Sequence, residues 1–423
     1  LPFTMHCEYM DADLFRAGLR LSHELDRRFG VTTIAAKMTD VPGHTRAIVP
    51  LLSEAGVKML HIGVNPASTA PAVPSAFRWR AEGKEILVCY DRADYGGVHS
   101  AAGADAALAL SHTGDNQGPQ DPEEIRSLFA DLRDRFPGAN VHASTLDAYT
   151  RAILPTTGDW PVVDEEIGDT WIHGVGTDPQ KTARFRAFLR HRRACLEQDP
   201  AAAKHSAWRS ADRHLICVAE HTWGCDIKNW ITDDKGKPKY AVVETAWATP
   251  DFSLKRERGE YRDWERTWRE QRAYLDAAAE ALEHTPWAVE TPWTTLEEDA
   301  AKALGWPDSE LSNDRVALSV DRVSGAVTRL RVDGRDWADT QHPWLTPLYQ
   351  VLGAAEYDRF IDAYNPRIEK TAGWAVPDFG KPGLDTVLPE GRSWSAAASA
   401  WRILHDAAMT EIRCTLQFPD SAC

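Results

Sequence analysis

The stretch "VTTIAAKMTDVPGHTRAIVPLLSEAGVKMLHIGVN", residues 31–65, decides the fold of the amino-terminal part of the chain. Its ends, "VTTIAAKM" and "KMLHIGVN", are short runs of β-branched and apolar residues and predict two strands. Between them, "TRAIVPLLSEAGV" has apolar residues at helical spacing and a glycine stop, which predicts a helix. A strand–helix–strand unit of this kind predicts a parallel sheet flanked by helices.

The same alternation continues on both sides of this stretch, up to about residue 160. Helices are predicted over "LFRAGLRLSHELDRRFG" (14–30), "DPEEIRSLFADLRDRFPG" (121–138) and "LDAYTRAIL" (146–154). Apolar runs typical of strands are "EILVCY" (85–90) and "ADAALALSH" (104–112), and "ANVHAST" (139–145) also predicts a strand. We therefore expect an α/β domain whose parallel sheet is open or closed into a barrel.

The rest of the chain has a different character. Long helical patterns over 180–198, near 213–230 and over 262–284 predict a small helical bundle. "DRVALSVDRVSGAVTRLRVDG" (314–334) alternates with period two around Ser-Gly and Asp-Gly turns, which predicts the start of an antiparallel β-sandwich. We expect three domains: an α/β domain over 1–178, a helical bundle over 179–300, and a β-rich domain over 301–423.

Composition narrows the possible partners and compartment. The chain has 63 acidic and 48 basic residues and a net charge of −15, which argues against nucleic acid and anionic membranes as partners. Its seven cysteines are scattered without a C-x-x-C pair, which is typical of reduced thiols in a cytoplasmic protein. No apolar run is long enough to cross a bilayer. The sequence leaves the oligomeric state open.

Asp40 is the first candidate for chemistry, because it ends the strand "VTTIAAKM" and precedes a Pro-Gly turn. Functional groups of parallel sheets gather at the carboxyl ends of their strands. The alternative is that Asp40 caps the helix that follows, although Thr45 is better placed for that task. Position alone leaves both interpretations open.

Three further segments place polar side chains after apolar runs. In "LALSHTGDNQGPQDPEEI" (108–125), Asp115 lies in what is either an ordinary turn or a second strand end bearing a carboxylate. In "TWIHGVG" (170–176), Trp171 and His173 set an indole beside an imidazole, a pair that suits a polar, ring-shaped ligand. In "LICVAEHTWGCD" (215–226), His221 is either a hydrogen-bonded core residue or a metal ligand. Asp121 and Asp178 each precede a proline at a helix start and are expected to be structural caps.

Taken in this order, the segments resemble a bacterial branch of the catalytic domain of family 38 glycoside hydrolases, the retaining α-mannosidases. The residues that carry the resemblance are "TDVPGHTRAIVPLLSEAGVKMLHIGV" (39–64), "FRWRAEGKEILVCYDRADYGG" (77–97), "LALSHTGDNQGP" (108–119), "TWIHGVGTDPQKTARFR" (170–186) and "AEHTWGCD" (219–226).

The resemblance implies roles for individual residues. It makes Asp40 both the catalytic nucleophile and a zinc ligand, and it makes Asp115 the general acid/base. His221 would be a second zinc ligand. The residues near the sugar would be Arg80, Tyr95, Trp171 and His173. The implied cofactor is Zn²⁺ and the implied substrate is a carbohydrate with an α-mannoside-type bond.

The family's zinc site also uses a His-x-Asp pair on the first strand of its sheet, and none stands in a suitable context before Asp40. The chain also begins at Leu1 without an initiator methionine. We therefore expect a fragment that lacks this strand and holds an incomplete zinc site. Asn116 and Thr222 stand where the family often has acids. They favour, as an alternative, a carbohydrate-binding relative without catalysis. A second alternative is a zinc-dependent hydrolase that acts on another substrate from the same strand-end site.

Overall fold

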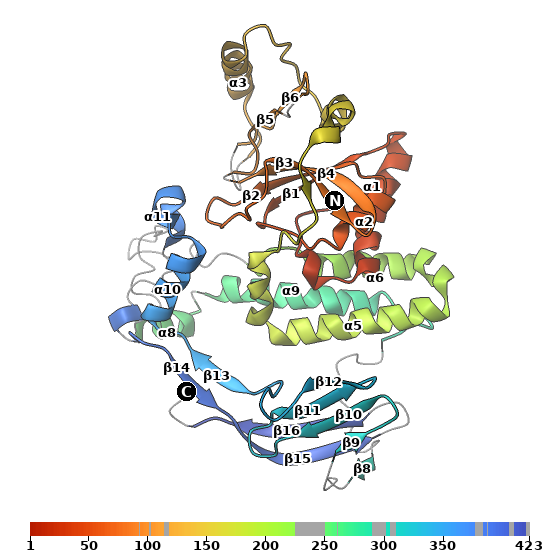
Figure 1. The fold of residues 1–423 in the computed structure, drawn as a ribbon, viewed down its shortest axis with the longest axis vertical. Helices are drawn as coiled ribbons and strands as arrows, with labels where there is room; N and C mark the ends of the chain where they lie inside the picture. The colour runs from red at the N-terminus through yellow and green to blue at the C-terminus, as the bar shows by residue number, and fades with distance from the viewer. Residues whose placement is uncertain are drawn as a thin grey trace. The chain divides into compact units, whose positions relative to one another are not determined.

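The computed structural model describes residues 1–92, 94–100, 103–113, 118–224, 250–259, 261–289, 302–304, 310–376, 384–386, 388–405 and 410–419. The chain divides into two compact units (Figure 1). Unit 1 comprises Leu1–Trp230, Gly259–Pro292 and Arg367–Gly373, and unit 2 comprises Ile231–Arg258, Trp293–Pro366 and Trp374–Cys423. The expected division into 1–178, 179–300 and 301–423 stays a prediction.

Unit 1 combines a five-stranded mixed sheet and a two-stranded sheet, β5–β6, with helices. Its strands are β1 (Ala35–Asp40), β2 (Met59–Val64), β3 (Ala76–Ala81), β4 (Lys84–Asp91), β5 (Val98–Ser100), β6 (Ala107–Ala109) and β7 (Val162–Val163). Its helices are α1 (Ala12–Phe29), α2 (Ile48–Glu54), α3 (Pro122–Arg135), α4 (Leu146–Ile153), α5 (Pro179–Gln198), α6 (Ser206–Val218), α9 (Arg262–Glu280) and α11 (Ile368–Thr371). Short 3-10 helices are η1 (Cys7–Tyr9), η2 (Leu154–Asp159), η3 (Thr170–Thr177) and η4 (Pro200–Lys204).

The main sheet has the strand order β1-β2-β4-β3-β7. The predicted unit over 31–65 is confirmed as β1–α2–β2 with parallel pairing, and β4 extends the parallel set. However, β3 is antiparallel to β4, because Glu82 and Gly83 form a two-residue turn in which both take positive φ. A connection this short permits only antiparallel pairing. No described pairing joins β7 back to β1, so the barrel stays a prediction.

Helices bury the sheet. Every residue of β2 is buried, as expected for a central parallel strand. Helix α4 places Tyr149 and Ile153 in one cluster with Met59 of β2 and Leu87 and Cys89 of β4. The strand predicted over 139–145 is wrong: this segment is irregular and mostly exposed, because it finds no neighbouring strand with which to share its backbone hydrogen bonds.

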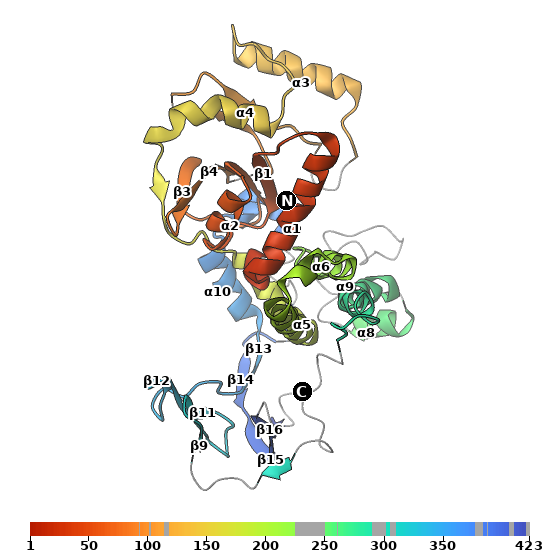
Figure 2. The same cartoon turned by 90° about the vertical axis from the view of Figure 1, so that its right-hand side faces the viewer.

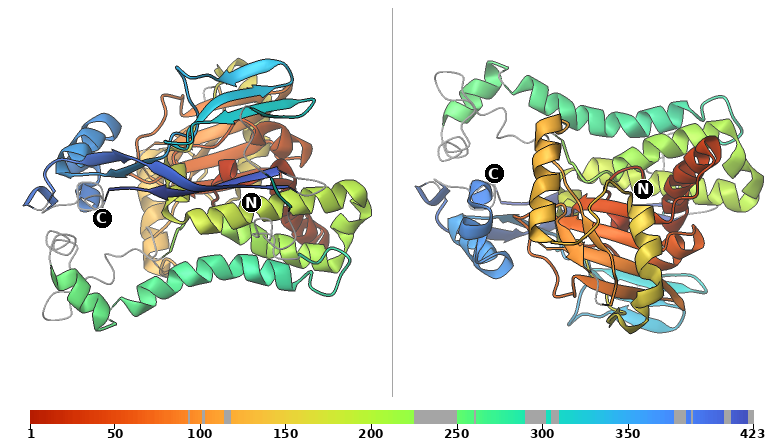
Figure 3. Two further views of the ribbon diagram at one scale, coloured as in Figure 1. Left: turned by 90° about the horizontal axis from the view of Figure 1, so that it is seen from below. Right: turned by 90° about the horizontal axis from the view of Figure 1, so that it is seen from above.

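The predicted helical bundle is present in unit 1 as α5, α6 and α9, which lie side by side (Figures 1 and 2). Figure 3 shows α9 along the edge of this bundle. The predicted caps are confirmed. Asp178 accepts a hydrogen bond from Lys181 N at the start of α5, and Asp121 forms a capping box with Glu124 at the start of α3. Helix α6 ends at Val218, earlier than the pattern near 213–230 predicts.

A buried ion pair joins three helices of unit 1. Arg192 of α5 donates to both carboxylate oxygens of Asp212 on α6, at 2.7 and 3.0 Å. Arg20 of α1 adds a third hydrogen bond to Asp212 at 3.0 Å. The side chains of Arg192 and Asp212 are only 2% and 5% exposed. The Arg20–Asp212 hydrogen bond therefore links α1 to the helical bundle, and the Arg192–Asp212 pair links α5 to α6.

Unit 2 consists mainly of antiparallel sheets. Its strands are β8 (Lys302–Leu304), β9 (Leu311–Ser312), β10 (Val316–Val320), β11 (Val327–Val332), β12 (Arg335–Ala338), β13 (Leu348–Val351), β14 (Arg392–Ser395), β15 (Ala397–His405) and β16 (Thr410–Gln417). Its helices are α8 (Pro250–Glu257), α10 (Ala354–Tyr364) and η7 (Leu384–Thr386), and η6 (Gly373–Ala375) lies at the boundary in sequence. The hairpin predicted over 314–334 is confirmed as β10–β11. Across the described ranges, no helix is both long and apolar enough to span a membrane.

The ion pair between Arg192 and Asp212 yields a stability prediction. Asp212→Ala leaves the Arg192 guanidinium buried without its carboxylate, and we expect a loss of about 3–5 kcal/mol in the free energy of unfolding. Urea denaturation followed by circular dichroism measures it. The control is Glu123→Ala, which breaks the exposed pair of Glu123 with Arg126 and should cost less than about 1 kcal/mol. Equal losses in the two variants would contradict a structural role for the buried pair.

Candidate functional site

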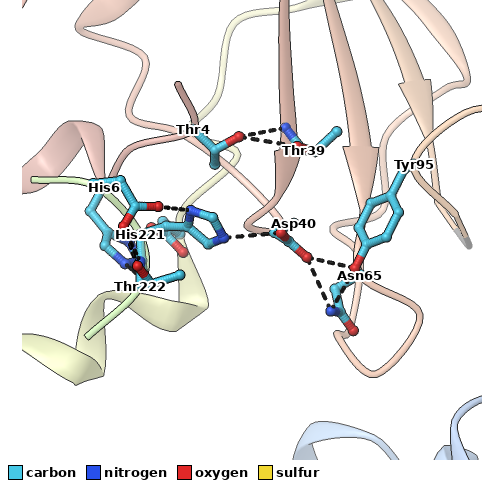
Figure 4. A network of polar contacts seen from close by, with 10 residues as sticks. Thr4, His6, Thr39, Asp40, Asn65, Tyr95, His221 and Thr222 are labelled. Atoms are coloured by element: carbon cyan, nitrogen blue, oxygen red, sulfur yellow. Dashed lines mark hydrogen bonds and ion pairs between the residues drawn. The ribbon is translucent and has the colours of Figure 1, made fainter. Parts of the chain in front are cut away.

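The Asp40 carboxylate lies at the carboxyl edge of the sheet and is surrounded by donors (Figure 4). Its Oδ1 accepts hydrogen bonds from the phenol of Tyr95 at 2.7 Å and from the side-chain amide of Asn65 at 3.1 Å. Its Oδ2 lies 2.9 Å from Nε2 of His221. Asn65 follows β2 directly and also bonds the Tyr95 hydroxyl at 3.0 Å. Three distant parts of the sequence thus converge on one carboxylate.

The backbone of Asp40 has an unusual conformation at the start of the Pro42-Gly43 turn. Its φ is +71°, in the left-handed region, which few non-glycine residues take, although aspartate does so more often than most. After it, Tyr90 at the end of β4 donates to the carbonyl of Pro42 at 2.5 Å. A Cβ at Gly43 would lie 2.0 Å from the carbonyl oxygen of Gly168, so only glycine fits there. The Pro-Gly turn is thereby explained by close packing.

The capping interpretation of Asp40 is wrong. Helix α2 begins at Ile48, and its N-cap residue, Ala47, makes no side-chain cap hydrogen bond. Thr45 accepts a hydrogen bond from Ala47 N, while the carboxylate of Asp40 is engaged with Tyr95, Asn65 and His221. Asp40 therefore faces the site and leaves the helix uncapped.

The imidazole of His221 is held from several sides. Its Nδ1 forms an ion pair with Glu220 at 2.6 Å, opposite the contact of Nε2 with Asp40. The backbone carbonyl of His221 lies 3.2 Å from Nε2 of buried His6. Nδ1 of His6 in turn lies 2.5 Å from Asp169. The indole of Trp171 stacks over the imidazole with a centroid distance of 6.5 Å. His221 is therefore fixed in orientation between two carboxylates.

Electrostatics follow from these contacts. Burial alone would raise the pKa of Asp40, but the hydrogen bonds from His221, Tyr95 and Asn65 outweigh it and lower the pKa below its ordinary value. Burial opposes the charged form of His221, yet Asp40 and Glu220 together raise its pKa to about 10. At neutral pH the side chain of His221 is therefore an imidazolium between the carboxylates of Asp40 and Glu220.

The structure brings together some of the residues singled out from the sequence and not others. Asp40, Tyr95, His221 and Trp171 lie together. Arg80 pairs with Glu85 at the start of β4, at the opposite end of the sheet from Asp40, and its side chain is exposed. Asp115 and the side chain of His173 lie outside the described residues.

Sequence reasoning did not assign a role to Asn65, Glu220 or the His6–Asp169 pair. The signal for Asn65 was present, because it ends the strand pattern "KMLHIGVN" just as Asp40 ends the preceding strand. Glu220 stood next to His221, but its role depends on the direction of its side chain. His6 and Asp169 are 163 residues apart, and no local pattern links them.

Two side chains of the site have atoms of the kind that ligate zinc. Catalytic zinc takes three protein ligands, and a ligating histidine usually donates its other ring nitrogen to a carboxylate. Asp40 and His221 present adjacent donor atoms, and Glu220 stands behind the imidazole as such a carboxylate would. Among the described residues, however, no group of three or more His, Cys, Asp or Glu side chains is arranged to hold a metal ion.

The paired charges yield a pH prediction for the metal-free protein. Asp40→Asn removes one of the two carboxylates at His221, so the pKa of His221 should fall from about 10 toward its ordinary value of 6.5. The pKa of His221 is raised in the folded protein. The stabilisation it provides is therefore complete below pH 6.5 and is lost as pH rises through about 10.

NMR titration of the imidazole nitrogens measures this shift. The control is Glu123→Gln, which changes an exposed carboxylate on α3 and should leave the titration of His221 unchanged. Titration of His221 near pH 6.5 in the unsubstituted protein would contradict the ion pairs.

Comparisons with known proteins give one family and several distant structural likenesses. No curated protein matches the sequence. An alpha-mannosidase from Enterococcus faecalis V583 is 16% identical, with a TM-score of 0.38 over 66% of this chain and 33% of its own length. A 4-alpha-glucanotransferase from Thermococcus litoralis is 9% identical, with a TM-score of 0.29 over 79% of this chain and 53% of its own length. The chain thus spans about a third and about half of the length of these two proteins.

A family model described as a domain of unknown function (DUF5054) matches residues 175–423. This range holds η3 from Val175 onward, the helical bundle, and all of unit 2. It also contains Glu220 and His221 of the site, whereas Asp40 and Tyr95 precede it. Since the match covers more than half of the 423 residues, the chain belongs to the family of proteins with the DUF5054 domain.

Proposed function

We propose that this chain carries the catalytic site of a glycoside hydrolase that cleaves α-mannoside-type bonds with retention. The observation that carries the proposal is the ionised, half-buried carboxylate of Asp40 at a strand end, ordered by three donors. Retaining hydrolysis needs such a carboxylate as its nucleophile. The motif resemblance to family 38 supplies the sugar and the retaining stereochemistry. The barrel form of the sheet and the sandwich form of unit 2 belong to the same proposal.

In the first step Asp40 attacks the anomeric carbon and forms a covalent glycosyl-enzyme. A carboxylate has about four lone-pair sites. Tyr95 and Asn65 occupy two on Oδ1, and His221 occupies one on Oδ2. The described hydrogen bonds therefore leave a site on Oδ2 for the bond to carbon. Because the three donors hold the carboxylate plane still, the attacking oxygen is oriented before the substrate arrives.

Asp115 would protonate the leaving oxygen and then take a proton from water in the second step. Its neighbourhood in sequence supports this role. His112, three residues earlier, has its ring 5.7 Å from the ring of Tyr95, and its Nε2 lies 3.4 Å from Asp94. The segment that leads to Asp115 thus begins beside a residue that bonds Asp40.

The proposed site would also bind a zinc ion. Asp40 and His221 would hold it, the imidazole then being neutral and binding through Nε2 in place of its hydrogen bond to Asp40, with Glu220 orienting the ring. When bound, zinc supplies a template and Lewis acid for sugar hydroxyls. Trp171 would offer its indole face, stacked beside His221, to the apolar face of the sugar ring.

The nucleophile is tested by trapping. An activated fluorosugar of the manno series should form a stable adduct, and peptide mass analysis should find it on Asp40. Asp40→Asn should lower kcat/KM for an aryl α-mannoside by about 10³-fold or more, because no covalent intermediate can form. Sugar binding without turnover by the unsubstituted protein would support the carbohydrate-binding alternative that Asn116 and Thr222 favour. Chelator-sensitive turnover of esters or amides alone would support the other zinc hydrolase.

The acid/base role has its own matched pair of variants. Asp115→Asn should lower kcat/KM by about 10²–10⁴-fold, and added azide should restore turnover of substrates with good leaving groups. Asp121→Asn changes a carboxylate six residues away that caps α3, and it should leave turnover unchanged. Equal losses in both variants, without azide rescue, would contradict the role of Asp115.

Metal content gives a further prediction. Two adjacent donors hold zinc more weakly than the three of a catalytic site, so we expect well under one equivalent of zinc per purified chain. Inductively coupled plasma mass spectrometry after desalting measures it. Stoichiometric zinc that survives in the unsubstituted chain but disappears in His221→Ala would show that the ligand set is larger than the described donors.

A further inference from the structure

Lys37 lies in the middle of β1, an edge strand of the main sheet, between the buried residues Ala36 and Met38. The register places it directly opposite His61 of β2. Its Nζ donates to the backbone carbonyl of Tyr95 at 2.6 Å and lies 3.0 Å from Nδ1 of His61. Lys37 therefore reaches across the sheet to the loop that follows β4.

The peptide of Tyr95 rests against β2 at a second point. A Cβ at Gly63 would lie 2.4–2.6 Å from the carbonyl, carbonyl carbon and Cα of Tyr95. Any larger residue at this position would push the loop away from the sheet. The backbone N–H of Val64 also donates to the carbonyl of Asp94 at 3.1 Å. The loop therefore packs against β2 at the peptide of Tyr95, and the Tyr95 side chain extends from there to Asp40.

The charges around Lys37 fit a hydrogen-bond donor that stays in place. Burial lowers the pKa of Lys37 to about 8, while Asp91 and Asp94 oppose this shift, so the ammonium persists at neutral pH. Burial, together with the charge of Lys37, lowers the pKa of His61 to about 3. His61 is therefore neutral, and its Nδ1 is free to accept from Lys37. Lys37 is partly buried, and its ammonium has two acceptors, the Tyr95 carbonyl and Nδ1 of His61.

We propose that Lys37 is a positioning residue for Tyr95. Lys37 holds the Tyr95 carbonyl against Gly63 of β2. It thereby positions the phenol for its 2.7 Å hydrogen bond to Asp40. Lys37 acts through Tyr95 and touches neither Asp40 nor the proposed substrate. Its effect on catalysis rests on the proposed function, whereas its effect on the phenol does not.

The first test reads the phenol directly. With tyrosine labelled at the ring carbon that bears the hydroxyl, the Tyr95 signal is assigned by its loss in Tyr95→Phe. Lys37→Met keeps a side chain of similar length and removes the ammonium that donates to the Tyr95 carbonyl. It should move the Tyr95 signal toward that of a solvent-exposed tyrosine. Lys84→Met is the matched control, because Lys84 is exposed at the start of β4, and it should leave the signal in place.

A second variant guards against misfolding. Gly63→Ala displaces the Tyr95 peptide without altering Lys37, and it should move the signal in the same direction. Circular dichroism and a thermal midpoint establish whether each variant is folded. An unchanged Tyr95 signal in folded Lys37→Met would overturn the proposal.

The second test is a double-mutant cycle on turnover of an aryl α-mannoside. Lys37→Met should lower kcat by about 10- to 100-fold with little change in KM, because a misplaced group weakens the reaction step more than sugar binding. In the Tyr95→Phe background the same substitution should change kcat by less than about threefold, because the group it positions is gone. Equal effects in both backgrounds would overturn the proposal.

The two tests separate this inference from the function on which its catalytic arm rests. A moved Tyr95 signal in a protein without mannosidase activity would support the positioning role and contradict the proposed function. An unmoved signal in an active enzyme would contradict the positioning role alone.

Discussion

Asp40 keeps a negative charge partly buried at the end of a strand, on a backbone with φ of +71°, and the surrounding structure compensates both features. A left-handed non-glycine residue costs on the order of 1–3 kcal/mol and persists only where neighbouring contacts determine it. Here those contacts come from Tyr95 after β4, Asn65 after β2 and His221 after α6. The strand ends and the helical bundle are thereby tied to one carboxylate.

The arrangement around that carboxylate also sets the charge of the site. Glu220 and Asp40 share the imidazolium of His221, so the three groups together carry a net charge of −1. In the proposed reaction, a net negative charge beside the anomeric carbon would stabilise the oxocarbenium-like transition state. The same imidazolium keeps Asp40 ionised. The geometry that holds the Asp40 carboxylate still is thus also the geometry that favours positive charge beside it.

Local patterns predicted the parts of this molecule that local physics controls. Strand–helix–strand alternation over 31–65 was enough to predict β1, α2 and β2, and Asp-Pro pairs were enough to predict the caps at Asp121 and Asp178. The β3–β4 hairpin was not predicted, because no strand was assigned to Ala76–Ala81 and Glu82-Gly83 was therefore not recognised as a turn between two strands. The strand predicted over 139–145 failed, since strand propensity stabilises nothing without a partner.

Violations of the apolar pattern carried more information about the site than the pattern itself. His61 interrupts β2, which is buried throughout, and Lys37 stands opposite it on the edge strand β1. Interruptions of this kind are expected where function outweighs local consistency. Recognising them as a pair requires the pairing of β1 with β2, which the sequence predicts. Recognising Tyr95 as their target requires the path of the loop after β4, which depends on Gly63 having no side chain. The sequence therefore contains both Lys37 and the loop residue Tyr95, but only the three-dimensional structure shows that they are in contact.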